Sequence, residues 1–589
     1  MSVYEFIKTN ETSYKSTPIT LADGYEWSMY EHVRKSFLYK NSKFFKGADD
    51  KKRPFKNIIL PILNVAYRSE GFDVKDIVPF VNDSENYYKS FFFKKFHPRW
   101  ARENNIDTAI DESVESYVDY GLTLLKNVDE TRPHTVPLES LAFCDQTDVL
   151  AGPLCIKHAY SPDELTEMGW NKEEVDRAIL KAETTKTPAQ TNTANRTPGK
   201  NIEVYELHGV LPKSWLMDDT DEKYEDAKDY IRQMHIITYF TDNDGKEQGI
   251  TLFKSKQKDL FKAIKRDNIF GRACGRGGIE ELFEPQTWIN YNEIQMKRML
   301  DAAALMLLKT TDKKFAQQNK VSDLDQNELM VLDEGKDISQ VTIQPQNKQM
   351  FEQAVLNWQQ EARVTGSASD PALGLNPVSG TPLGTTELVT QQGIGIHEYR
   401  QGKLATFWGN EVYPDWVLPR LVTEMNQGQK FLEELTLEEL QEVAETVTTN
   451  TTNQRIKEII LDNGNISEEE VETFRTVTKE NFMKGGNKRF IEILKGEIKD
   501  LPVDVEINIA GKQKDLAKAA DALNNIFRFV FSNPQGFMQV MQIPGMSKSF
   551  NDILEFSGLS PVNFGGITKQ MIESMQPEPQ MALSAPVTQ

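Results

Sequence analysis

The sequence predicts an α+β fold with a mixed N-terminal lobe, two long central helices and a mostly helical C-terminal lobe. Three observations indicate this. Residues 200–256 alternate apolar and polar side chains with the period of a strand, and Asp244-Gly245 supplies a hairpin turn. Residues 278–310 carry apolar side chains at helical spacing. From residue 428 the chain becomes acidic and helical in pattern.

The length and composition limit the classes of protein to consider. With 589 residues the chain exceeds one compact core, so we expect two to four lobes. The formal charge of −20 argues against a protein that grips nucleic acid over its whole surface, although a local basic ring stays compatible with it. Three cysteines, Cys144, Cys155 and Cys274, form neither a disulfide framework nor a zinc pattern, which favours a reducing compartment.

The N-terminus and the hydropathy pattern predict a protein made in the cytoplasm. The first residues, MSVYEFIKTNETSYKS, lack the apolar core of a signal peptide. No apolar run approaches the length of a membrane span. We therefore expect no membrane partner.

The N-terminal lobe is predicted over residues 1–277. An apolar helix interrupted by Pro61 covers residues 58–65, and Gly71 ends it. A second amphipathic helix starts near Ile106 and ends at Gly121. Between them, FFFKKFHPRW (residues 91–100) mixes aromatic and basic side chains. That composition could stack bases, but a helix end with buried aromatics and snorkelling lysines is the favoured interpretation.

The stretch around which the chain is organised begins with glycines at residues 271–278 and continues as a helix over residues 278–310. Pro285 falls in the first turn if the helix begins near Gln286, or marks a kink if it begins near Ile279. A helix of this length needs neighbours that bury its stripe. The apolar stripe comprises Ile289, Ile294, Met296, Met299, Leu300, Ala303 and Leu307. The polar face carries Asn290, Glu293, Lys297, Arg298 and Asp301.

The elements that follow are predicted from local pattern. Residues 311–345 form a small α/β insert, and residues 346–364 a second helix. Residues 365–385 are dense in Gly, Pro, Ser and Thr, and a loop this long is usually functional or disordered. A helix follows within residues 386–427, weakened by glycines. Residues 428–575 form the helical lobe, with a strand at residues 503–510, and residues 576–589 a disordered tail.

Catalytic and metal-binding motifs are missing from the sequence. It contains no GxxxxGK[ST], G-x-S-x-G, HExxH or HxE…CxxC. His134 and His158, with the nearby cysteines, fit no common metal spacing. Glu280 and Glu281 are explained as carboxylates that favour a helix N-terminus. We therefore predict no catalytic residue, no cofactor and no metal site.

The segment Gly275-Arg276-Gly277-Gly278 precedes a helix and could cradle a phosphate. It lacks the G-x-G-x-x-G spacing, so a helix cap or hinge is the favoured interpretation. The competing hypothesis is an enzyme that processes nucleic acid or nucleotides and holds phosphate in this segment.

Several segments in a fixed order resemble portal proteins of tailed bacteriophages. They are ELFEPQTWIN (281–290), LDEGKDISQV (332–341), Val364-Thr365-Gly366 and SGTPLGTTEL (379–388). Upstream, ESVESYVDYG (112–121) and VPLESLAFCD (136–145) suit the same family. The resemblance spans roughly residues 50–425, and the order of the motifs is stronger evidence than any one of them.

The resemblance implies a ring, usually of twelve subunits, at one capsid vertex, with double-stranded DNA passing through its channel. In a portal-like fold, residues 1–277 and 386–427 would form the wing, 278–310 and 346–364 the stem, 311–345 the clip and 428–575 the crown. Residues 365–385 would be the channel-facing tunnel loop. Its candidate residues are Thr365, Gly366, Asp370, Leu373, Asn376, Ser379 and Gly380.

The implied partners are those of a virion component. They are the terminase large subunit, head-completion adaptor or tail proteins, the major capsid protein and, optionally, a scaffold protein. DNA would pass without sequence readout. A different ring protein of a phage head or tail, such as an adaptor, is a further alternative, although 589 residues is large for one.

The charge fits a conduit. Twelve copies at −20 each carry −240, and a largely acidic channel repels DNA and lets it slide. We expect a minority of basic residues at the lumen or the motor face. These are Lys297, Arg298 and Lys309 on the stem and Lys313, Lys314 and Lys320 in the terminase-facing clip. The alternative for each is an ordinary solvated helix charge.

Overall fold

A computed structural model describes most of the chain and divides it into two compact units. Residues 1–71 and 105–408 form the first unit, and residues 72–104 with 409 onwards form the second. The described residues are 2–46, 53–83, 86, 89–127, 132–184, 201–216, 229–241, 247–257, 260–304, 307–309, 339–341, 348–368, 372–373, 383–434, 437–461, 467–484, 488–493 and 501–507.

The first unit combines helices and antiparallel strands. Its helices are α1 (Val3–Ser16), α2 (Met29–Lys40), α3 (Ile59–Glu70), α5 (Ile106–Tyr120), α6 (Pro162–Glu167), α7 (Lys172–Thr184), α8 (Gly278–Glu281), α9 (Phe283–Ala304), α11 (Lys348–Thr365) and α12 (Leu383–Phe407). Its strands are β1 (Ile19–Ala22), β2 (Tyr25–Trp27), β4 (Leu122–Asn127), β5 (Pro133–Thr135), β6 (Leu141–Phe143), β7 (Leu154–Tyr160), β8 (Ile202–Pro212), β9 (Tyr230–Thr241), β10 (Glu247–Lys256), β11 (Phe261–Lys265), β12 (Leu307–Lys309) and β13 (Ser339–Val341).

A five-stranded antiparallel sheet in the order β10-β9-β8-β7-β6 forms the β-rich part of this unit. The predicted hairpin is confirmed as the β9–β10 pair, in which Glu247 lies opposite Thr241. Alternate side chains of β8, such as Tyr205 and Leu207, enter a core shared with α1, while Val204 enters a second core beneath α6 and α7. The alternation in the sequence therefore reflects two buried faces rather than one.

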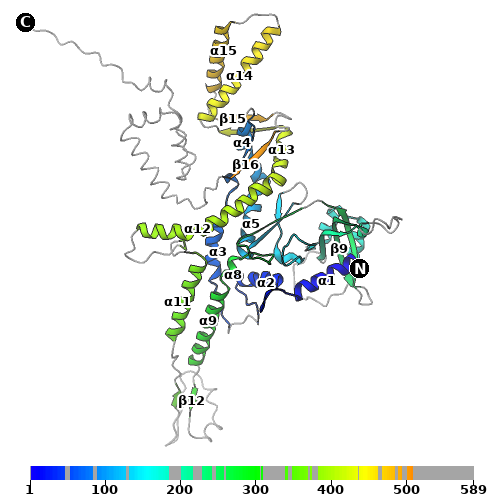
Figure 1. Cartoon of the computed structure of the whole chain (residues 1–589), viewed down its shortest axis with the longest axis vertical. Coiled ribbons are helices and arrows are strands. Elements are labelled where there is room, and N and C mark those ends of the chain that lie inside the picture. The colour runs from blue at the N-terminus through cyan, green and yellow to red at the C-terminus, as the bar shows by residue number, and fades with distance from the viewer. Residues whose placement is uncertain are drawn as a thin grey trace, which may run out of the picture. The chain divides into compact units, whose positions relative to one another are not determined.

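A smaller antiparallel sheet, β11-β4-β5, lies beside α5 and brings the chain to the glycine-rich segment. From there α8 leads into α9, and α9 and α11 run side by side down to β12 (Figure 1). Strands β12 and β13 pair antiparallel at that end, so the chain descends along α9 and returns along α11. Helix α12 then packs on α3.

The second unit joins a short N-terminal stretch to the C-terminal part of the chain. Its described elements are β3 (Ile77–Val81), α4 (Ser90–Glu103), a π-helix that begins in the first unit (Trp408–Val417), α13 (Leu418–Asn426), β14 (Gln429–Glu434), α14 (Leu437–Leu461), α15 (Glu468–Lys484), β15 (Lys488–Ile493) and β16 (Val503–Ile507). Strand β16 pairs antiparallel with β3, and Val503 lies opposite Val81. Helices α14 and α15 lie side by side (Figure 1).

Two sequence-based boundaries differ from the division of the structure. Residues 72–104 were expected in the N-terminal lobe, but β3 pairs with β16, so they belong to the second unit. The helical segment expected over 386–427 is shared, since α12 belongs to the first unit and α13 to the second. In the C-terminal lobe, the strand expected at residues 503–510 is found as β16, whereas β14 and β15 lie in stretches without a predicted strand. The pairing of β3 with β16 joins segments far apart in the chain, and local periodicity does not record it.

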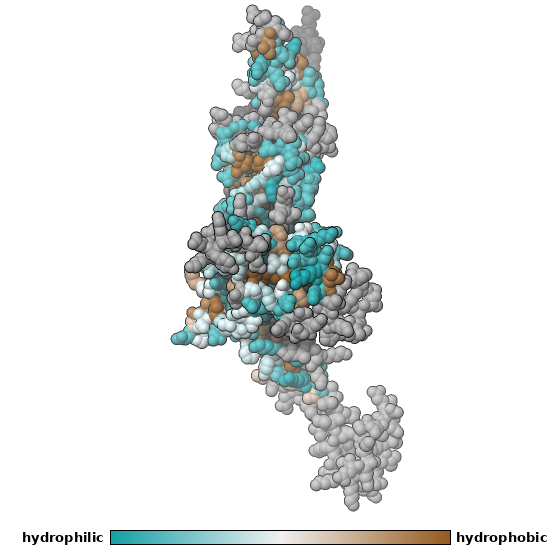
Figure 2. Space-filling view, turned by 90° about the vertical axis from the view of Figure 1, so that its right-hand side faces the viewer, coloured by the Kyte–Doolittle hydropathy of each residue, from teal (hydrophilic) through white to brown (hydrophobic). Residues whose placement is uncertain are grey.

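Two local predictions hold. Helix α4 buries Phe93, Phe96 and Trp100, which confirms that this aromatic cluster is core. Cys144, Cys155 and Cys274 are free and buried. Hydrophobic residues on the face drawn in Figure 2 lie in small separate groups among hydrophilic ones. Within the described residues, no helix combines the length and the apolar character that crossing a bilayer requires.

Candidate assembly site on the α9–α11 helix pair

The helix expected over residues 278–310 is two helices and a strand. A tight turn at Leu282, whose N–H donates to the carbonyl of Ile279, separates α8 from α9, and α9 ends at Ala304. Pro285 is the third residue of α9, where a missing N–H leaves no intrahelical bond unmade. Each sequence-based alternative for Pro285 is partly right. A short helix, α8, begins near Ile279, and a new helix, α9, begins at Phe283 with Pro285 in its first turn.

The glycine-rich segment caps α8 and packs against the end of α5. Gly277 is the N-cap residue of α8. A Cβ placed on Gly277 would lie 2.3 Å from the carbonyl oxygen of Asp119, so only glycine allows this approach. The predicted role as a cap is confirmed.

The same packing disfavours a phosphate cradle. The N–H of Gly275 donates to the carbonyl of Gly121, and the N–H of Arg276 donates to that of Asp267. Gly275, Gly277 and their neighbour Gly278 are buried. Backbone donors that are already bonded inside the protein are not available to an anion.

A buried ion network fixes the base of the helix pair. The carboxylate of Glu70 at the end of α3 accepts hydrogen bonds from Arg266 at 2.8 and 2.5 Å and from Nδ1 of His397 at 2.7 Å. Arg400, one turn after His397 on α12, donates to Asp267 at 2.5 Å and to Glu281 at 2.8 Å. The network therefore joins α3, α8, α12 and the segment after β11.

Electrostatics in this network favour the ionised carboxylate. Burial alone would raise the pKa of Glu70, but the hydrogen bonds from Arg266 and His397 outweigh it and hold that pKa below its ordinary value. Removing one member leaves the others charged and buried, which is strongly destabilising.

A second ion pair holds the first residues of α8. Both Nη atoms of Arg272 lie 2.9 Å from the carboxylate oxygens of Glu280, and the guanidinium stacks 4.7 Å from the ring of Trp27. Glu280 and Glu281 were interpreted only as carboxylates that favour a helix N-terminus. The structure shows that both also have arginine partners, which sequence spacing could not reveal.

Two amide side chains clamp α9 to the segment before α3. Gln286 accepts from the N–H of Ile58 at 3.0 Å and donates to the carbonyl of Lys56 at 2.7 Å. Asn290, one turn later, accepts from the N–H of Lys56 at 3.1 Å. Both amides are buried, so they complete backbone hydrogen bonds that would otherwise be missing.

The helix pair divides into two parts. We define the base as residues 278–292 and 355–366, and the outer part as residues 293–304 and 348–354. The base buries Ile279, Leu282 and Ile289 on one side and Val355 and Ala362 on the other. No described side chain of the outer part is buried. Its apolar stripe is therefore only partly covered in a single chain.

Aromatic residues join the two helices and continue onto the surface. The rings of Trp288 and Trp358 stack with centroids 6.1 Å apart, and Tyr291 packs edge-on against Trp288 at 5.8 Å. Trp288 is nevertheless 44% exposed and Tyr291 50% exposed. Leu356 on α11 is 57% exposed. Large exposed aromatics of this kind are typical of protein interfaces.

The predicted basic residues of the stem have unequal surroundings. Lys297 forms an i,i+4 ion pair with Asp301 on its own helix, with Nζ 3.0 and 3.1 Å from the two carboxylate oxygens. Arg298 is exposed on the outer part of α9. Lys309 lies on β12, and its side chain is outside the described residues. Lys313, Lys314 and Lys320 fall wholly outside them.

The start of the predicted tunnel loop packs against α3 of the first unit. Thr365 is the last residue of α11 and is exposed. A Cβ on Gly366 would lie 2.3 Å from Cγ2 of Ile62 in α3, so the chain can pass there only as glycine. Leu373 is half-buried. Asp370, Asn376, Ser379 and Gly380 lie outside the described residues.

Sequence reasoning missed the residues of the buried network. Glu70, Arg266, His397 and Arg400 come from three segments far apart in the chain. Glu70, His397 and Arg400 lie on helices and Arg266 follows β11, and no spacing in the sequence reveals that they are partners. Within the described residues, no group of three or more His, Cys, Asp or Glu side chains is placed to hold a metal ion.

Comparison with known proteins gives weak likenesses only. No protein-family profile and no curated protein matches the sequence. Among solved structures, a chain from "Neck of empty GTA particle computed with C6 symmetry" is 9% identical, with 71% of this chain and 93% of that chain covered, at a TM-score of 0.31. A chain from "Virion of native gene transfer agent (GTA) particle" is 8% identical, covering 71% and 92%, at 0.28. One from "Neck of native GTA particle computed with C12 symmetry" is 9% identical, covering 63% and 84%, at 0.28. TM-scores this low do not establish a shared fold.

Proposed function

We propose that the chain is a portal subunit, which assembles with copies of itself into a ring at one capsid vertex. The channel of the ring carries double-stranded viral DNA during packaging and ejection. Its outer surface docks the terminase large subunit and later the head-completion or tail proteins.

The incompletely buried apolar stripe on the outer part of the helix pair carries this proposal. Ile294, Met296 and Met299 follow helical spacing, yet none of them is buried in the single chain, and Leu300 is 44% exposed. A long amphipathic helix is stable when its stripe is covered. In a ring each helix pair has a neighbour on either side, and head-to-tail contacts of this kind close into a cycle.

The proposal assigns the remaining segments as follows. Helices α9 and α11 form the stem, residues 311–345 the clip, and residues 365–385 the tunnel loop. The first unit supplies the wing and the C-terminal residues the crown. In the stem, Lys297 is already neutralised by Asp301, so the lining holds DNA weakly and lets it slide.

The competing hypothesis, a nucleotide-processing enzyme, finds less support. It needs free backbone donors in the segment before α8, and Gly275 and Arg276 have theirs bonded to Gly121 and Asp267. The enzyme hypothesis also leaves the exposed stripe of α9 without a role.

Imaging and mass measurement test the proposal together. Full-length protein is purified, concentrated, examined by negative-stain electron microscopy, and weighed by native mass spectrometry. We expect a monodisperse ring with an axial hole and no nucleotide turnover. A chain that stays single at every concentration and hydrolyses ATP would contradict the proposal.

A further inference from the structure

The most exposed large apolar side chain among the described residues is that of Phe270, which is 90% exposed in the loop after β11. The N–H of Arg272 donates to the carbonyl of Ile269 at 3.3 Å, and Gly271 between them has a φ of +82°. These features define a type II turn, whose third position favours glycine because it requires a positive φ. Phe270 occupies the second position. We call residues 269–272 the Phe270 turn.

Arg272 fixes this turn to the rest of the first unit. Both of its Nη atoms bond the carboxylate of Glu280, and Nη1 also donates to the hydroxyl of Tyr25 at 3.2 Å. A Cβ on Gly271 would lie 3.0 Å from Cδ2 of Leu21, so the turn packs on β1 as well. A side chain on a fixed backbone loses less conformational entropy on binding than one on a loop that must first be ordered. The aromatic side chain of the turn is therefore suited to anchor a contact with another protein.

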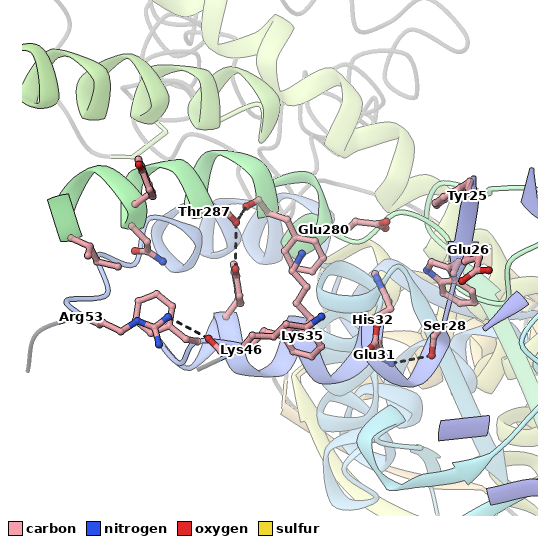
Figure 3. A pocket seen from close by; sticks show the side chains of 18 residues that line it. Tyr25, Glu26, Ser28, Glu31, His32, Lys35, Lys46, Arg53, Glu280 and Thr287 are labelled. Atoms are coloured by element: carbon pink, nitrogen blue, oxygen red, sulfur yellow. Dashed lines mark hydrogen bonds between the residues drawn. The ribbon is translucent and has the colours of Figure 1, made fainter. Parts of the chain in front are cut away.

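The β1–β2 hairpin beside the Phe270 turn presents acidic side chains. Asp23 and Glu26 are both exposed on that hairpin. Figure 3 shows Glu26 below Tyr25 at the right of the view, and Tyr25 is itself 45% exposed. The surface around Phe270 therefore combines an aromatic anchor with negative charge.

A cavity of about 170 Å³ opens at the other end of β11. Phe261, the first residue of that strand, lines it, whereas Phe270 follows Lys265, the last residue, by five positions. All of the lining belongs to the first unit, as the Phe270 turn does. We call this space the β11 cavity. One chain therefore presents the turn and the cavity on separate parts of one compact unit.

The β11 cavity has the size and the lining that suit one aromatic side chain. A cavity of about 150 Å³ with apolar walls binds benzene in another protein. Val210 is 50% exposed and Leu150 40% exposed, so apolar surface at the β11 cavity is uncovered in a single chain. The apolar lining comprises Leu150, Pro153, Leu154, Val210, Leu260 and Phe261.

Basic side chains lie at the β11 cavity. Arg232 is exposed and is the only Lys, Arg, Asp or Glu in its lining. Lys256 is exposed as well, and in the β9–β10 pair it lies opposite Gln233, another lining residue. The acidic Asp148 nearby accepts from the N–H of Leu150 and lies outside the lining. The cavity lining therefore carries charge of the sign opposite to that beside Phe270.

We propose that Phe270 of one copy of the chain inserts into the β11 cavity of the next copy around the ring. The volume of the cavity matches one aromatic side chain. The acidic hairpin beside Phe270 complements the basic residues at the cavity. Because the turn and the cavity lie on different parts of one unit, the contact is head-to-tail, and contacts of that kind repeat around a ring. This inference rests on the proposed ring and names one contact that would hold it together.

Variants of the two surfaces test their part in assembly. Phe270→Ser removes a side chain that is 90% exposed, so the folded chain should be unaffected, while the concentration for half-assembly should rise about tenfold or more. Val210→Asp, which places a charge at the cavity, should have a similar effect. The matched control is Leu180→Ser on α7, where the side chain is 62% exposed outside the cavity and no change is expected. Circular dichroism and thermal melting of dilute protein check folding, and mass photometry across concentration measures assembly.

Cross-linking tests the pairing itself with both surfaces intact. Asn268 precedes the Phe270 turn and Ala151 lines the β11 cavity, and both are exposed. The three native cysteines are buried, so a short bismaleimide should react at introduced cysteines. In assembled protein, Asn268→Cys combined with Ala151→Cys should give a ladder of covalent oligomers on a denaturing gel. Asn268→Cys combined with Leu180→Cys is the control and should give no ladder.

The outcomes separate this inference from the proposed function. Impaired assembly of Phe270→Ser and Val210→Asp, together with the ladder, supports the second copy as the partner of Phe270. Rings of the unmodified chain that Phe270→Ser matches, or that give no ladder, would overturn the inference and leave the portal proposal standing. An unmodified chain that never assembles would overturn both.

Discussion

The base and the outer part of the helix pair belong to the same two helices but have opposite surroundings. The base is held by Glu70 and Arg266, by the amides of Gln286 and Asn290, and by buried apolar side chains. The outer part has no described side chain that is buried. The comparison shows that a single chain buries side chains in the first part and leaves the described side chains of the second part half-buried or exposed, which is the part that the proposed ring would cover. Buried hydrogen bonds and ion pairs characterise the base, and partly exposed apolar side chains characterise the outer part.

The largest expected effect comes from breaking the ion network of the base. Glu70→Gln keeps the shape but leaves Arg266 buried without its main counter-charge. We expect a loss of about 3 kcal/mol in the free energy of unfolding of the first unit. Urea titration at neutral pH, followed by circular dichroism, measures it. A loss below 1 kcal/mol would show that the network does not hold the base.

A pH dependence of similar size should come from His32 in α2. Burial lowers its pKa to about 4, with Glu280 opposing and Arg272 adding to the effect. The unfolded chain, whose histidine pKa is about 6.5, then binds more protons between pH 6.5 and 4. Stability is therefore complete above about pH 6.5 and falls as the pH drops, by about 3 kcal/mol in all.

The variant His32→Gln isolates this contribution. It keeps a donor for the carbonyl of Tyr120 but cannot titrate. Buried His97 and His235 also have pKa values lowered to about 4, and they are unchanged in the variant. Urea titrations at pH 7.5, 6, 5 and 4.5 should give the variant a shallower decline. Parallel declines for both proteins would rule out His32 as a source.

The amide clamp should have a smaller effect. Gln286→Leu removes bonds to the backbone of Lys56 and Ile58 and leaves a buried N–H unsatisfied. We expect about 2 kcal/mol of destabilisation in urea. The matched control is Gln353→Leu in the outer part, where the amide bonds only Asn357 on an exposed surface and the expected change is near zero. Equal effects at both positions would erase the distinction between the two parts.

These contrasts also show what the sequence could predict. Helical spacing correctly placed a long amphipathic helix at the centre, and the glycines before it act as a cap at Gly277. Alternation correctly placed the β9–β10 hairpin. Such features depend on neighbours in the chain, so local pattern records them.

Other features depend on partners that are distant in the chain. The break at Leu282, the pairing of β3 with β16 and the joining of Glu70 to His397 each involve segments that no local period relates. The apolar stripe of α9 was expected to be buried by neighbouring elements. Its periodicity could not show that its outer residues stay partly exposed in a single chain. The buried donors of Trp27 and Asn290, which lack a partner among the described residues, could not be recognised from the sequence for the same reason.

The smallest expected effect is that of the ion pair on the outer part. Lys297 and Asp301 are solvent-exposed enough that Asp301→Asn should change stability by no more than about 0.5 kcal/mol, and added salt should remove the change. Thermal melts at low and high salt test this. A loss comparable with that of Glu70→Gln would mean that the outer part is ordered by its own charges.

Cryo-electron microscopy of the assembled full-length chain tests the central claim most directly. The portal account predicts a closed ring in which the helix pairs surround an axial hole and the neighbouring copy covers Trp288, Tyr291 and the stripe at Ile294 to Leu300. A particle without a channel, or a ring in which these side chains still face solvent, would contradict it.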